Sequence, residues 1–158
     1  MSARWLLAAV LAAGMASAWQ PAHATGSRTI AVNATVVPVC KFFTAAPAIN
    51  VRNTGTTGAN IDPSLATTAT GNVAIAYRCT NGTTPAFALP TSATLTCAAC
   101  AGTPTMAATL TSTNSGAGTG LGTGRNRTLT VTGSITAAVF QNAPAGAYSG
   151  SVTVSVTP

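Results

Sequence analysis

PAGAYSGSVTVSVTP, residues 144–158, is the stretch that decides the fold we predict for this chain. Pro144 and Gly146 predict a turn. Polar and apolar side chains then alternate, which predicts a β-strand with one apolar face. The apolar positions are Tyr148, Val152, Val154 and Val156. No residues follow this strand in the printed sequence, so we expect its neighbour in the sheet to come from an earlier segment or from another molecule.

The first 24 residues predict a secretory signal peptide. Arg4 precedes an apolar run from Trp5 to Met15, and a small-residue cleavage site follows at Ala22–Ala24. The apolar run is too short to span the roughly 30 Å of membrane hydrocarbon. A cut after Ala18 is the main alternative to a cut after Ala24. In either case the remaining chain is long enough for one domain with its own core.

The composition predicts that the protein is not an enzyme. The chain has a single acidic side chain, Asp62, and its only histidine, His23, lies in the predicted signal peptide. General acid–base catalysis usually uses His, Glu, Asp, Lys, Tyr or Cys, but the remaining sequence has neither His nor Glu, and Asp62 precedes a proline, which favours a turn-forming role. Paired-carboxylate chemistry needs a second acid and a Ser-His-Asp site needs a histidine, and the remaining sequence has neither. Two thiols without histidine or further carboxylates do not fill a zinc site. We therefore predict no catalytic residues, no cofactor and no metal.

The positive charge of the chain does not predict a nucleic-acid partner. The formal net charge is +6, and removal of the signal peptide leaves six cations against Asp62, a net charge of +5. Binding to a nucleic-acid backbone needs a basic patch, and single-strand binding also needs aromatic platforms. The cations are scattered instead, at Arg28, Lys41, Arg52, Arg78, Arg125 and Arg127.

Four cysteines in an exported chain predict disulfide bonds. Three pairings are possible, and the sequence alone does not choose between them. Pairing cysteines that are close in the sequence favours Cys40 with Cys79 and Cys97 with Cys100. The second pair forms a CAAC motif, the spacing of a redox-active pair, but its flanks predict no helix whose N-terminus would lower a thiol pKa. We expect a loop-clamping disulfide there.

Two further segments alternate as strongly as the last one. The segment GNVAIAYRC places Val73, Ile75, Tyr77 and Cys79 on one face and predicts a central strand. Residues 127–140 place Leu129, Val131, Ile135, Ala137 and Val139 on one parity, with Gly133 as a bulge. We expect this strand to form a hairpin with the last one through QNAPAG.

Weaker signals complete a prediction of six or seven short strands. Residues 27–39 alternate, with one face made of Ile30, Val32, Ala34 and Val36. Short strands are expected at 48–52, at 86–89 after an Asn81-Gly82 hairpin turn, and at 105–111. The Gly- and Ser-rich residues 114–126 predict a mobile loop. The fold class that follows is an all-β sandwich.

Three segments resemble the spore coat protein U domain family, whose members include pilin subunits of archaic chaperone-usher pili. They are ATVVPVC (34–40), GNVAIAYRCTNGT (71–83) and PAGAYSGSVTVSV (144–156). Between residues 91 and 126 the chain departs from the family pattern, because it lacks a clear aromatic-rich strand pair and carries CAAC instead.

The resemblance implies an immunoglobulin-like β-sandwich that lacks its last strand. Residues 25–36 would be a donor strand and residues 37–158 the pilin domain. The donor residues would be Ile30, Val32, Ala34 and Val36. The acceptor groove would be lined by Tyr148, Val152, Val154 and Val156.

The resemblance also implies partners and a location. A periplasmic chaperone would hold the subunit, an outer-membrane usher would export it, and other copies or related pilin subunits would complete its fold in a surface fibre that serves adhesion or biofilm formation. No small-molecule substrate is expected. The alternatives are a self-contained secreted β-sandwich that forms a coat through surface contacts, and a thiol-disulfide oxidoreductase that uses Cys97 and Cys100.

Overall fold

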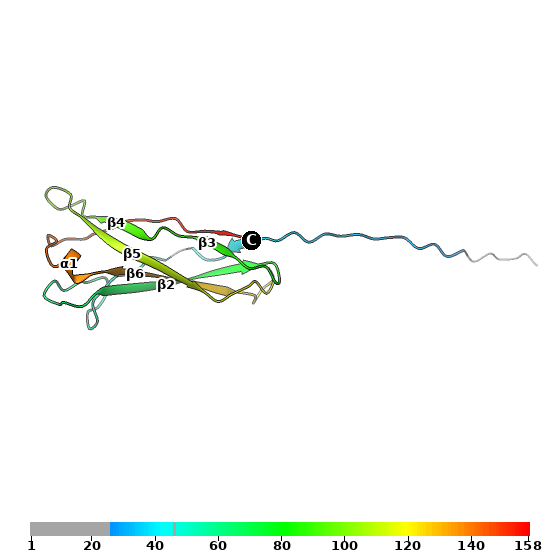
Figure 1. Cartoon of the computed structure of the whole chain (residues 1–158), viewed down its shortest axis with the longest axis horizontal. Helices are drawn as coiled ribbons and strands as arrows, with labels where there is room; N and C mark the ends of the chain where they lie inside the picture. The colour runs from blue at the N-terminus through cyan, green and yellow to red at the C-terminus, as the bar shows by residue number, and fades with distance from the viewer. Residues whose placement is uncertain (1–25, 46) are drawn as a thin grey trace, which may run out of the picture. The chain divides into compact units, whose positions relative to one another are not determined.

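The computed structural model describes residues 26–45 and 47–158 (Figure 1). The chain divides into two units, Met1–Ala34 and Thr35–Pro158. In the first unit, residues 26–34 are exposed and form no strand. The predicted signal peptide, residues 1–24, lies outside the described residues.

The second unit is all-β, as the sequence predicts, and its strand pairs are antiparallel. A five-stranded sheet has the order β1-β2-β6-β5-β4, and a two-stranded sheet pairs β3 with β7. The strands of the large sheet are β1 (Cys40–Phe42), β2 (Ala69–Cys79), β4 (Ser92–Thr96), β5 (Thr105–Asn114) and β6 (Arg127–Ile135). The small sheet contains β3 (Ala86–Ala88) and β7 (Ser155–Thr157), and one helical turn, α1 (Ala137–Phe140), follows β6.

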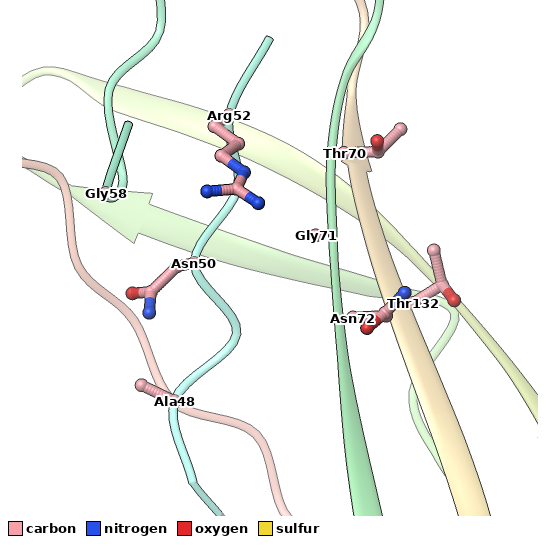
Figure 2. A pocket seen from close by; sticks show the side chains of 8 residues that line it. All are labelled: Ala48, Asn50, Arg52, Gly58, Thr70, Gly71, Asn72 and Thr132. Carbon is pink, nitrogen blue, oxygen red and sulfur yellow. The ribbon is translucent and has the colours of Figure 1, made fainter. Parts of the chain in front are cut away.

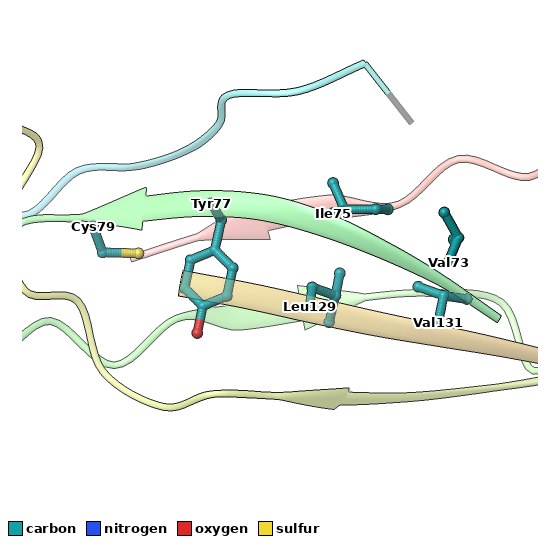
Figure 3. Close-up of a cluster of buried hydrophobic side chains, with 6 residues drawn as sticks. All are labelled: Val73, Ile75, Tyr77, Cys79, Leu129 and Val131. Carbon is teal, nitrogen blue, oxygen red and sulfur yellow. The ribbon is translucent and has the colours of Figure 1, made fainter. Parts of the chain in front are cut away.

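Strands β2 and β6 form the centre of the large sheet and supply most of one buried cluster. The predicted apolar face of β2, from Val73 to Cys79, is buried, and so are Leu129 and Val131 of β6 (Figure 3). Tyr77 and Leu129 have no exposed surface at all. Alternation with a period of two residues places all these side chains on one face of the sheet. The predicted faces of both strands are therefore confirmed.

The small sheet covers this buried cluster through Phe87 of β3. The Phe87 ring meets the Tyr77 ring edge to face, with their centroids 5.0 Å apart, and lies 6.2 Å from the ring of Phe42. Such pairs contribute about 0.5–1.5 kcal/mol beyond the burial of their area. The Tyr77 hydroxyl donates a hydrogen bond to the Gly116 carbonyl, so the polar tip of this buried ring is satisfied.

The end of β6 differs from the prediction. The strand stops at Ile135, and residues 137–140 form the turn α1, which places Phe140 in a second buried cluster with Met106 and Ala108. Gly133 is not a bulge, because it pairs in unbroken register with Gly71 on one side and Leu110 on the other. Its missing side chain instead leaves room for neighbouring side chains to pack against the sheet.

Both predicted hairpins are wrong in their pairing, although the turns exist. The Asn81-Gly82 turn forms, with Gly82 at a φ of 78°, but the strand that follows it pairs with β7 and not with β2. The QNAPAG segment leads away from β6, and Ser149 beyond it bridges to Thr96 at the end of β4. Of the strand predicted at residues 48–52, only Arg52 pairs, with Thr70. Residues 27–39 form no strand.

The region between residues 91 and 126 is more ordered than the sequence suggests. It contains the hairpin of β4 and β5, with the CAAC motif in its turn. The segment predicted as a mobile loop is hydrogen-bonded to its surroundings: the amides of Gly118 and Gly120 donate to the carbonyls of Thr83 and Cys79, at 2.8 and 3.0 Å. Gly118 is buried against Cys79.

Gly71 offers a test of this packing, because the backbone of Asn50 crosses directly over it. A Cβ atom at position 71 would collide with the Asn50 carbonyl group. We expect Gly71→Ala to lower the free energy of unfolding by about 1–3 kcal/mol, as overpacking usually does. Urea unfolding monitored by circular dichroism measures this difference.

The matched control is Gly122→Ala, because no atom lies within 4 Å of a Cβ atom built there. We expect its free energy of unfolding to change by less than about 0.5 kcal/mol. Equal unfolding midpoints for the two variants would contradict the close crossing at Gly71.

Candidate functional site

The candidate site is the place where strands β1 and β7 approach each other. Strand β1 pairs only with β2, and β7 pairs only with β3. Cα atoms of β1 and β7 come within 8 Å of one another, yet no ladder joins the two strands. Within the described residues, each strand therefore has one unpaired edge, whose N–H and C=O groups are available to a further strand.

The unpaired edge of β1 continues into residues 43–45 and 47–51, which leave the sheet and return to it. The amide of Phe43 still donates to Ala76 of β2, at 3.0 Å, and the next backbone pairing with β2 is that of Arg52 with Thr70. Phe42 and Arg52 are ten residues apart in the sequence, but the residues of β2 that they pair with, Tyr77 and Thr70, are only seven apart. Because of these three extra residues, the segment leaves the β1–β2 register, and the Asn50 backbone crosses over Gly71 of β2.

One aromatic side chain of this segment is exposed. Phe43 has 41% of its surface accessible, and the guanidinium of Arg78 lies 4.0 Å from its ring centroid. The ammonium of Lys41 lies 5.3 Å from the same centroid. Cation–π contacts at exposed sites contribute about 0.5–1 kcal/mol, so they hold the ring in place without burying it.

The predicted acceptor residues lie along the last segment of the chain and are only partly covered. Tyr148 is half-buried against the second cluster and donates a hydrogen bond of 2.9 Å to the Pro144 carbonyl. Val154 is half-buried against the first cluster, and Val156 lies opposite Phe87 in the small sheet. Val152 is 38% exposed. Tyr148, Val154 and Val156 are thus partly covered in three different places, and of the strand predicted here only Ser155–Thr157 is regular.

The predicted donor residues are exposed. Ile30 and Val32 have 82% and 88% of their surface accessible, and Ala34 is also exposed. These three belong to the first unit. Val36 belongs to the second unit and is 81% exposed. None of these four residues lies in a strand, so their backbone groups are not part of a ladder.

The Cys40–Cys79 disulfide fixes the edge strand β1. The two residues are directly opposed in the β1–β2 register, and Cys79 is fully buried. The pairing of Cys40 with Cys79 is the one that the sequence analysis favours. Because β1 contains only three residues, the covalent bond at Cys40 supplies much of what holds it against β2.

The Cys97–Cys100 disulfide clamps the β4–β5 turn and supports the start of the last segment. The Cys97 amide donates to the Pro104 carbonyl across the turn, at 3.0 Å. Cys97 is fully buried. A Cβ atom at Gly146 would collide with both sulfur atoms, so the disulfide packs directly on the backbone of this residue. The sequence marks Gly146 only as a turn residue and gives no sign of this contact.

The described residues offer no obvious acid–base pair. Asp62 is exposed, and hydrogen bonds from the Ser64 side chain and amide hold the pKa of its carboxyl below the ordinary value. Among residues 26–45 and 47–158 no three His, Cys, Asp or Glu side chains gather as metal ligands would. In the same ranges, no helix has the length and apolar character needed to cross a membrane.

No family model, curated protein or solved structure matches this chain. What the fold and the site define is therefore a class: an all-β protein with two disulfides and two unpaired strand edges that approach each other.

The two disulfides differ in the loops they close, and this difference predicts different costs of removal. The sequence separations are 39 and 3 residues. By chain entropy, the first bridge contributes about 4 kcal/mol and the second about 2 kcal/mol. We expect Cys40→Ser or Cys79→Ser to abolish accumulation of the folded protein, because small domains have little stability to lose.

The comparison is the double variant Cys97→Ser with Cys100→Ser, which should still accumulate. Quantitative immunoblotting of the soluble protein measures both outcomes. Wild-type amounts of the Cys40→Ser protein, or complete loss of the double variant, would reverse the expected order.

Proposed function

We propose that this protein is a secreted structural subunit of a bacterial surface pilus or fibre that assembles by donor-strand exchange. In this proposal the second unit is an immunoglobulin-like sandwich of the spore coat protein U type that lacks its last strand. The observation that carries the proposal is the pair of unpaired edges at β1 and β7. A strand placed beside them would join the two sheets.

The donor in this proposal is the segment 25–36 of another copy or of a related subunit. Strand addition, the mode by which pilin donor strands bind, gains affinity from main-chain hydrogen bonds and specificity from alternate side chains that enter pockets. Ile30, Val32, Ala34 and Val36 have the required spacing of two residues. Their exposure leaves them available for burial in a neighbour.

The spacing of the edges indicates how insertion would proceed. Neighbouring strands in a sheet lie about 4.8 Å apart, so a strand inserted between two others needs about 9.6 Å between its flanking backbones. Cα atoms of β1 and β7 come within 8 Å of each other. The two edges must therefore separate by at least about 1–2 Å to admit a donor. This requirement favours a periplasmic chaperone that lends a strand and keeps the edges apart.

A covered edge also protects the subunit before assembly. Unpaired strand edges with apolar side chains promote aggregation, so a cell must cover them. In this proposal the chaperone covers them in the periplasm, an outer-membrane usher exchanges the chaperone strand for the next subunit's donor, and the fibre at the cell surface serves adhesion or biofilm formation.

The closeness of β1 and β7 also favours a second candidate function. A chain whose two edges already approach within 8 Å can be a self-contained secreted coat protein that assembles through surface contacts. For a thiol-disulfide oxidoreductase the support is weaker, because Cys97 is fully buried and the CAAC motif joins two strands rather than opening a helix.

Charge substitutions on the two sides of the proposed contact should have different effects. Ile30→Asp or Val32→Asp would bury an unpaired carboxylate in the neighbouring subunit, at a cost of several kcal/mol, while the subunit's own core stays intact. We expect chaperone binding to persist and polymerisation to fail. Val154→Asp places the charge against the subunit's own core, so both the chaperone complex and the fibre should be lost. Chaperone co-purification and surface fibres are the two measurements.

Ala31→Asp is the matched control, because it adds the same charge to the opposite face of the same segment. Its fibres should be normal or nearly so. If Ile30→Asp abolishes solubility and chaperone binding as thoroughly as Val154→Asp does, the segment belongs to its own domain and donor-strand exchange is wrong.

A further inference from the structure

A polar pocket opens where the segment 48–52 diverges from the edge of β2. Its volume is about 430 Å³. Asn50 and Arg52 line it from the diverging segment, Thr70 and Asn72 from β2, and Thr132 from β6 (Figure 2). Gly71 also lines the pocket, at the point where the Asn50 backbone crosses over it.

Arg52 is the charged group of this pocket, and its guanidinium has no partner among residues 26–45 and 47–158. The other two arginines beside the large sheet are engaged: Arg78 donates to Asn126 and Leu121, and Arg127 donates to Ala117. In the described part of the chain, Arg52 forms hydrogen bonds only through its backbone, which pairs with Thr70. Five guanidinium N–H donors are therefore available to a ligand.

The chain itself has almost nothing to neutralise this cation. Asp62 is its only acidic side chain, and that carboxylate accepts hydrogen bonds from the amide and hydroxyl of Ser64, at 2.9 and 2.7 Å. The net charge of +5 that remains after removal of the predicted signal peptide adds a field that attracts anions. A planar guanidinium matches a carboxylate in a two-pronged pair, which makes a carboxylate the fitting anion.

The surface beside the pocket is a regular array of hydroxyl groups. Across the outer face of the large sheet, Thr132 of β6 lies between Asn72 of β2 and Thr111 of β5, and Ser134 lies between Thr70 and Thr109. Opposed side chains in such rows have Cβ atoms about 4.5–5.5 Å apart, and successive rows are about 6.7 Å apart. These rows begin at the pocket and offer an extended array of hydrogen-bond donors and acceptors.

We propose that this pocket binds the carboxylate of an acidic saccharide. Arg52 pairs with the carboxylate, the Asn72 amide and the Thr132 hydroxyl bind hydroxyl groups of the saccharide, and adjoining units lie along the rows toward Thr111. Uronic acid polymers have this chemistry, with one carboxylate on each unit. The inference does not depend on strand exchange, since all of the residues involved belong to the second unit.

Isothermal titration of the purified exported chain with alginate oligosaccharides tests the proposal. We expect saturable binding that Arg52→Ala weakens about ten- to a hundredfold, the usual effect of losing hydrogen bonds to a charged group. Thr132→Val, which removes one hydroxyl at nearly constant shape, should weaken binding about three- to tenfold. Thermal unfolding of each variant checks that the fold is retained.

The matched control is Arg125→Ala, which removes the same charge from an exposed residue outside the pocket. It should change the affinity less than about twofold. A neutral maltooligosaccharide of equal length should not bind, and polyglutamate, which has carboxylates without sugar hydroxyls, should bind at least tenfold more weakly than alginate. Equal effects of Arg52→Ala and Arg125→Ala, equal binding of polyglutamate and alginate, or no alginate binding at millimolar concentration would each overturn the proposal.

Discussion

The pairing of β2 with β6 is the interaction on which the other parts of the second unit depend. Nine consecutive residue pairs, from Ala69 with Ile135 to Tyr77 with Arg127, join two strands whose apolar faces are buried together. Strand β1 attaches to one side of this ladder through the Cys40–Cys79 disulfide, and β5 attaches to the other side. The small sheet packs on it through Phe87. The central ladder is complete, so what the molecule leaves unpaired lies at its margins.

One of those margins, the edge of β2 beside Arg52, contains an irregularity of the chain. Residues 43–51 contain three residues more than the stretch of β2 beside them, and they cross over Gly71, where a side chain would not fit. Ile49 and Val51 turn inward and pack on the two buried clusters, while Arg52 lines the polar pocket. A short, loosely paired edge is costly in stability, but it leaves backbone groups accessible that a longer regular strand would have covered.

The sequence predicts faces well and partners poorly, and the reason is physical. Alternation in β2 and β6 places Tyr77 and Leu129 in the core, because burial alone fixes which side of a strand is apolar. Alternation does not fix which strands pair. Strand β3 pairs with β7, about seventy residues later in the sequence, whereas the Asn81-Gly82 turn predicts a local hairpin. The strand predicted at residues 105–111 is confirmed as part of β5, but its partner β4 is not predicted, because the weak contrast among its Ser, Ala and Thr residues hides its period. The Arg52 pocket has no local signal, because it arises from an offset between two distant segments.

The two proposed sites lie on opposite sides of the same segment and need not compete. Strand β1 uses one edge for β2, so a donor strand would join the other edge, which faces away from β2. The Arg52 pocket lies between the segment and β2. Assembly would therefore leave one pocket open on every subunit. A fibre would repeat the pocket along its length, and a polymer with one carboxylate per unit can engage several copies at once. Such linked binding raises the overall affinity by orders of magnitude above that of a single site, provided that the ligand spans neighbouring pockets. A pocket of modest individual affinity would then suffice for adhesion.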